Sequence, residues 1–99
     1  MDLNKLMRQA QQMQEEMKKK QDEVENTLFN ASVAGGALKV SVYGNHVVEK
    51  VEFDKDVLNP EDKEMIEDMV KAAFTEVNKK IDEATAQIAS SMQSQFGGF

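Results

Sequence analysis

Two adjacent glycines, Gly35 and Gly36, lie in the stretch SVAGGALKVSVYGN and are the residues that most readily suggest chemistry. A phosphate-binding loop places its glycines directly before a helix whose first backbone amides face the anion, often with lysine and then serine or threonine. Here the glycines precede an alternating run typical of a strand, and the sequence contains no Gly-Lys-Ser or Gly-Lys-Thr. The pattern therefore favours a turn between two strands over a phosphate cradle.

Other residues with catalytic or metal-binding side chains are sparse. His46 is the only histidine, lies in a predicted turn and has no evident partner. Asp54 and Asp56 would need several more oxygens to hold a divalent metal, whereas aspartate is also favoured at turns. Three serines near the C-terminus lack a glycine elbow and triad partners, and the chain has no cysteine. We therefore expect no enzyme activity, no metal, no cofactor and no small-molecule substrate.

The densest basic cluster is the stretch MKKKQ, which contains Lys18, Lys19 and Lys20. Three consecutive residues span about 200° around a helix, so these lysines cannot form one stripe. Glu15 and Glu16 precede Lys19 and Lys20 by four residues, a spacing that favours ion pairs on a solvated face. A dimer would carry two copies of the cluster on projecting helices, however, and two copies could bracket a polyanion.

The chain is acidic, with 12 lysines and arginines against 18 aspartates and glutamates and a net charge of −6. Taken whole, this balance argues against nucleic acid, because its binders usually present a basic surface. The acid is concentrated in residues 54–99, whereas residues 1–26 are nearly balanced. With 99 residues, no cysteine and no apolar run as long as a membrane span, we expect one cytoplasmic domain without a membrane partner.

Two long helices are expected to position the charged groups. Residues 1–26 contain good helix formers and an apolar seam with steps of three and four. Residues 60–90 follow a helix-start signal, with Asn59 as the N-cap and Pro60 in the first turn, and carry one apolar face. The residues expected to pack in the core or across a dimer are Leu3, Leu6, Met7, Ala10, Met13, Met17, Val70, Phe74, Val77 and Ile81.

The segment between the helices, residues 27–53, alternates apolar and polar residues in three runs, which predicts an antiparallel three-stranded meander. Its short connections contain glycine, and we expect these glycines to supply positive φ angles. Residues 91–99 should form a flexible tail, in which the role of Phe96 and Phe99 stays open. The predicted fold is one α+β domain over residues 1–99, and its helices are too long for a monomer to cover, which indicates a homodimer.

Three long stretches carry a resemblance to a known family: MDLNKLMRQAQQMQEEM, AGGALKVSVYGNHVVEKVEFD and LNPEDKEMIEDMVKAAFTEVNKK. In this order and spacing they resemble the YbaB/EbfC family of bacterial nucleoid-associated DNA-binding proteins. The resemblance implies an α-β-β-β-α fold and a tweezer-like homodimer in which terminal helices pack across the subunits. It also implies non-enzymatic, largely sequence-nonspecific DNA binding in the nucleoid, linked to nucleoid organisation and gene regulation.

The candidate DNA contacts are clustered cations on the helices expected to form the arms, and the resemblance does not single them out. They would bind the phosphates of double-stranded DNA, with counterion release supplying most of the affinity. An alternative is a protein–protein adaptor that uses the Met-rich helical surface, because methionine suits promiscuous surfaces. The candidate contacts are Lys5, Arg8, Lys18, Lys19 and Lys20 on the first helix, and Lys79 and Lys80 on the second.

Overall fold

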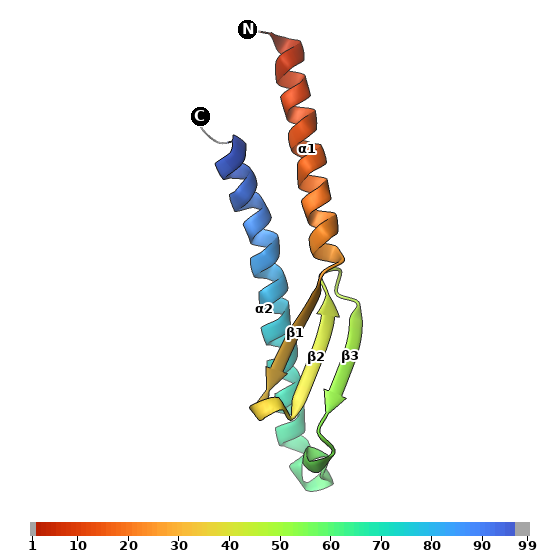
Figure 1. The fold of residues 1–99 in the computed structure, drawn as a ribbon. Helices are drawn as coiled ribbons and strands as arrows, with labels where there is room; N and C mark the ends of the chain where they lie inside the picture. Colours follow the sequence, from red (N-terminus) through yellow and green to blue (C-terminus); the bar gives the residue numbers. More distant parts are fainter. Residues whose placement is uncertain (1, 97–99) are drawn as a thin grey trace.

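Two long helices and a three-stranded sheet make up the molecule (Figure 1). The computed structural model describes residues 2–96, and the side chains of residues 2–93. The predicted α+β class and α-β-β-β-α order are confirmed. The elements are α1 (Leu3–Glu25), β1 (Leu28–Val33), β2 (Leu38–Tyr43), β3 (Val48–Phe53) and α2 (Lys63–Phe96).

Side-chain caps fix where the two helices begin. Asp2 accepts a hydrogen bond from the backbone N–H of Asn4 at 3.0 Å, which satisfies one of the free donors at the start of α1. Asn59 accepts in the same way from the N–H of Glu61 at 3.1 Å, but the turn that it caps, Pro60–Asp62, is a 3-10 turn. α2 therefore begins after this turn, three residues later than the sequence predicts.

The C-terminal end of α2 also differs from the prediction. The sequence predicts that the helix ends near residue 90 and that residues 91–99 form a tail, whereas α2 continues to Phe96. Residues 91–96 include no glycine or proline, and Met92 is buried, so packing supports this last stretch of helix. The side chain of Phe96 and the whole of Phe99 lie outside the described residues.

The sheet is a meander in the order β1-β2-β3 with both pairs antiparallel, as predicted. Ala31, Val40 and Val51 are partners across the three strands, so their side chains lie on one face. α2 packs on this face, over β1 and β2. The core between the two layers consists of Ala31, Leu38, Val40, Val42, Met69, Ala73, Val77 and Ile81.

All of the third strand except its last residue, Phe53, is left uncovered on the face that elsewhere packs against α2. Val48 and Val51 of β3 keep 49% and 46% of their surface exposed, although their partners Val42 and Val40 are buried. The apolar layer of the sheet is therefore wider than the helix that covers it. An uncovered apolar strand beside a core is a surface on which another layer can pack.

The turn between β2 and β3 is held against the end of α1. The backbone N–H of Gly44 donates to the carbonyl of Thr27 at 3.0 Å, and the N–H of Asn45 donates to the carbonyl of Glu25 at 3.3 Å. A Cβ atom at position 44 would overlap the carbonyl of Val24. Glycine is thus required here by close approach, and the expectation that it supplies a positive φ is wrong: that angle, 71°, belongs to His46.

The molecule is elongated because α1 and α2 pack on each other and project away from the sheet (Figure 1). Its extents are 71 × 22 × 16 Å, and its radius of gyration is 19.7 Å. A compact protein of this length has a radius of gyration of about 13 Å. The first turns of α1 extend beyond the end of α2, and Leu3, Leu6 and Met7 are exposed there.

Candidate nucleic-acid interface

The three consecutive lysines of α1 point in different directions, as the rotation of the helix requires. Lys18 and Lys19 are exposed, whereas Lys20 is half-buried. The Nζ of Lys20 donates a hydrogen bond to the hydroxyl of Ser91 on α2 at 3.0 Å. Lys20 therefore faces the other helix, and only two of the three lysines point to solvent.

Acidic side chains surround the exposed lysines of this cluster. Lys18 and Lys19 share one hollow along α1 with Glu15, Asp22 and Glu23. Three carboxylates against two ammonium groups leave this surface without a net positive charge. The arrangement fits a solvated, mixed-charge face better than a basic patch, although among the described residues neither Glu15 with Lys19 nor Glu16 with Lys20 forms the expected ion pair.

The remaining predicted cations lie at separate places along the molecule. Lys5 and Arg8 are exposed on the projecting end of α1. Lys79 is exposed on α2, and the Nζ of Lys80 donates to the backbone carbonyl of Asn30 on β1 at 2.6 Å. The structure thus distributes the seven predicted contacts along the molecule and does not gather them in one patch.

The residues predicted to pack in the core or across a dimer divide along the chain. Val77 and Ile81 are buried under the sheet, and Val70 and Phe74 are half-buried against the same core. On α1, Met13 and Met17 are half-buried. The seam residues before them are exposed in the single chain: Leu3, Leu6, Met7 and Ala10.

The glycine pair and the two aspartates serve turns. Gly35 and Gly36 have φ angles of 67° and 93° in the connection between β1 and β2, and a strand follows them. No helix N-terminus follows, so the turn is the correct interpretation and the phosphate cradle is not. The carboxylate of Asp54 accepts from the backbone N–H of Asp56 at 3.1 Å, which caps a short 3-10 turn.

Sequence reasoning missed two lysines on the face of the sheet opposite α2, although it did select Lys80, which lies beside them. Lys39 of β2 and Lys50 of β3 line one hollow together with Lys80, which reaches past the free edge of β1. We call this the outer-face hollow; its polar lining also includes Asn30, Ser32, Ser41 and Glu52. The alternation places both sheet lysines on polar strand faces, but only the register, in which Lys39 lies opposite Glu52 and Ser41 opposite Lys50, brings them together.

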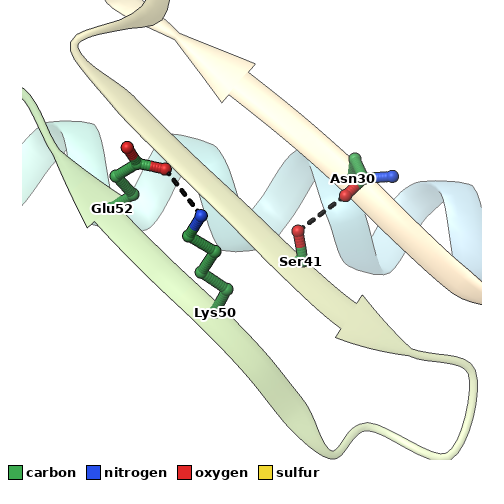
Figure 2. Close-up of polar contacts among 4 residues, drawn as sticks. All are labelled: Asn30, Ser41, Lys50 and Glu52. Atoms are coloured by element: carbon green, nitrogen blue, oxygen red, sulfur yellow. Dashed lines mark hydrogen bonds and ion pairs between the residues drawn. The ribbon is translucent and has the colours of Figure 1, made fainter.

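Figure 2 draws two of the polar contacts inside the outer-face hollow. Lys50 forms an ion pair with Glu52 at 3.0 Å, and the hydroxyl of Ser41 donates to the side-chain oxygen of Asn30 at 2.6 Å. The hydrogen bond from Lys50, followed by its charge, lowers the pKa of the Glu52 carboxyl below its ordinary value. Glu52 is therefore ionised at neutral pH and neutralises one of the three lysines.

The fold and these surfaces define a class: a small, elongated α-β-β-β-α protein with cations on exposed helix and sheet faces. The sequence profile of the YbaB/EbfC DNA-binding family matches residues 1–96. The chain belongs to the YbaB/EbfC DNA-binding family. Within the described residues, neither helix is apolar enough over a sufficient length to cross a membrane.

Relatives with curated names support the same assignment. The chain is 41% identical over 93 residues to a nucleoid-associated protein of Buchnera aphidicola subsp. Baizongia pistaciae, which covers 94% of this chain and 84% of the relative. It is 42% identical over 86 residues to a nucleoid-associated protein of Clostridium novyi, covering 87% of this chain and 75% of the relative.

A solved structure has the same fold. The crystal structure of the uncharacterised protein HP0035 from Helicobacter pylori aligns with a TM-score of 0.77 over 93% of this chain and 97% of the other. The two sequences are 24% identical, so this likeness concerns the fold alone.

Proposed function

We propose that the chain binds double-stranded DNA as a homodimer, largely without sequence specificity, and contributes to nucleoid organisation and gene regulation. The observation that carries the proposal is membership of the DNA-binding family over residues 1–96, together with relatives named as nucleoid-associated proteins. Exposed cations such as Lys5 and Arg8 on the projecting part of α1 fit contacts to phosphates, which carry no base information.

A homodimer is supported by the surface area of the single chain. The chain exposes 7515 Å², whereas a compact protein of its mass exposes about 5,700 Å². A standard interface buries about 800 Å² on each partner. The excess surface is thus sufficient for a stable interface and still leaves the ends of the helices free as arms.

The uncovered strand β3 is the part of the surface that best fits a second copy. Val48 and Val51 continue the apolar layer of the core, and Leu58 and Met65 are exposed large hydrophobic residues just beyond this strand and in the first turn of α2. A second copy would complete the layer over β3 and remove these side chains from water. Twofold symmetry would then place two pairs of α1 and α2 in one assembly.

A protein–protein adaptor would have a smaller exposed methionine surface than the sequence indicates. Met13 and Met17 are half-buried on α1, and only Met7 of the three is exposed. The pair closer to the sheet therefore contributes to packing within the chain, which leaves the adaptor function with a small surface.

A salt titration of duplex binding tests the proposed function. Fluorescence anisotropy with two duplexes of unrelated sequence should give similar dissociation constants, and log Kd should rise linearly with log salt. The slope should be about 0.9 for each phosphate neutralised, because bound cations release condensed counterions. A Kd above about 10⁻⁴ M at low salt, weaker than ordinary non-specific binding, would exclude DNA as the partner.

A further inference from the structure

The outer-face hollow is a basic surface on an acidic protein. Its lining holds three lysines, Lys39, Lys50 and Lys80, and one acid, Glu52, whereas the whole chain carries a net charge of −6. The three lysines come from β2, β3 and α2, so the fold, and not a run of sequence, gathers them.

The three lysines differ in whether an acidic side chain already neutralises their charge. The ammonium group of Lys50 pairs with Glu52, and that of Lys80 donates to a backbone carbonyl, which is neutral. Lys39 has no hydrogen bond or ion pair to any residue in the described part of the chain. After the one ion pair, two unit positive charges remain at the hollow without a matching acid.

Neutral hydrogen-bonding groups lie between the cations. Ser41 donates to the oxygen of the Asn30 amide, so the amide nitrogen of Asn30 points away from Ser41 as a further donor (Figure 2). Hydroxyl and amide groups beside lysines are a common composition of phosphate contacts in protein–DNA interfaces.

We propose that the outer-face hollow is a second DNA contact, in which Lys39, Lys50 and Lys80 bind the phosphate backbone of a duplex. The inference rests on the proposed function and adds the sheet to the helices as a binding surface. Neighbouring strands are about 4.8 Å apart, so lysines spread from β3 to beyond β1 can reach different phosphates of one duplex. None of the residues lining the hollow is aromatic, which leaves no stacking platform for the bases of a single strand.

Glu52 has a defined part in this surface. Its carboxylate forms an ion pair with the ammonium group of Lys50, so a phosphate must compete with Glu52 for that group. Replacement by the neutral isostere glutamine frees Lys50 and raises the local charge by one. The structure therefore predicts one substitution that strengthens binding as well as others that weaken it.

Paired substitutions in the full-length chain test the sheet contact. Lys39→Gln with Lys50→Gln should reduce the salt slope of duplex binding by about 1.8 and weaken binding at least tenfold at about 0.1 M salt. The matched control, Lys63→Gln with Lys71→Gln, removes the same charge from exposed positions on α2 outside the hollow and should leave the slope within about 0.5 of the wild-type value. Glu52→Gln should tighten binding and steepen the slope.

The outcomes separate the sheet contact from the proposed function. If Lys39→Gln with Lys50→Gln lowers the salt slope and the affinity no more than Lys63→Gln with Lys71→Gln does, while the wild-type chain still binds the duplex, the sheet contact is overturned and DNA binding stands. A wild-type chain that fails to bind overturns both.

Nuclear magnetic resonance of the wild-type chain titrated with a short duplex gives a second, mutation-free measurement. Amide shifts at Asn30, Lys39 and Ser41 support the contact, and shifts confined to α1 overturn it.

Discussion

Glu52 is the only acid among the residues that line the outer-face hollow, and its state sets the charge of that surface. Its pKa is lowered because Lys50 donates a hydrogen bond to it and because the two charges attract. Both side chains of the pair are exposed to solvent, so its main consequence is local charge and not stability. The sheet face thus exposes two effective cations at neutral pH and three after Glu52 is protonated.

The lowered pKa of Glu52 can be measured directly. Titration of its side-chain carboxyl by nuclear magnetic resonance should give a pKa below that of an ordinary glutamate, and Lys50→Gln should move the pKa upward. A carboxyl with a lowered folded-state pKa stabilises the fold above its ordinary pKa, and this contribution disappears as pH falls through the lowered value. An unchanged pKa in Lys50→Gln would show that the lysine is not the cause, with Lys63→Gln as the control.

The position of α1 relative to the sheet depends on the junction at Gly44. At this point the β2–β3 turn donates two backbone hydrogen bonds, from Asn45 to the last residue of α1 and from Gly44 to Thr27 just after the helix. The close approach to Val24 leaves no room for a side chain. The long helix is therefore fixed to the sheet by main chain contacts at its C-terminal end.

Gly44→Ala should destabilise the fold, because the added Cβ overlaps backbone and no flexible side chain can yield. We expect a loss of about 2 kcal/mol or more in the free energy of unfolding, equivalent to at least about 8 °C in Tm for a domain of this size. Thermal unfolding at one fixed protein concentration, followed by circular dichroism, measures the change.

Gly35→Ala is the matched control for the junction. Gly35 has a φ of 67° but open space around its Cβ position, so alanine there should cost only the roughly 1 kcal/mol of left-handed backbone. Equal melting temperatures for the two variants would contradict the argument that close packing makes Gly44 necessary.

The order and type of the elements could be predicted from the sequence, because each depends on local patterns. The period-two alternation of β2 and the cap at Asn59 are examples, and both occur in the structure. The grouping of Lys39 with Lys50 and Lys80 could not be predicted, since it depends on strand register, on a bulge near Ser41 and on the packing of α2. Single-residue properties also misled: Gly44 suggested a positive φ, whereas its role is set by contact with another element.

At the scale of the whole molecule, the chain is an elongated unit whose core is covered on two of three strands. The radius of gyration of 19.7 Å and the exposed valines of β3 both show that the single chain leaves apolar surface unpacked. A second copy placed over β3 would leave the outer-face hollow free, because the hollow lies on the opposite face of the sheet. The proposed dimer and the proposed sheet contact are therefore compatible, and a dimer would present two such hollows to DNA.

Val51→Lys tests the proposed dimer. The wild-type chain should sediment at micromolar concentration with twice its chain mass of 11.1 kDa. A lysine buried without a partner in the proposed interface should raise the dimer dissociation constant at least about 100-fold, because desolvating an unpaired charge costs several kcal/mol. The control Ser32→Lys adds the same charge at an exposed position on the opposite face of the sheet and should stay dimeric.

If Val51→Lys sediments like the wild type, β3 is not the interface. If the wild type sediments as a monomer, the excess surface of the chain has another use, and DNA binding loses the avidity that two linked sites provide.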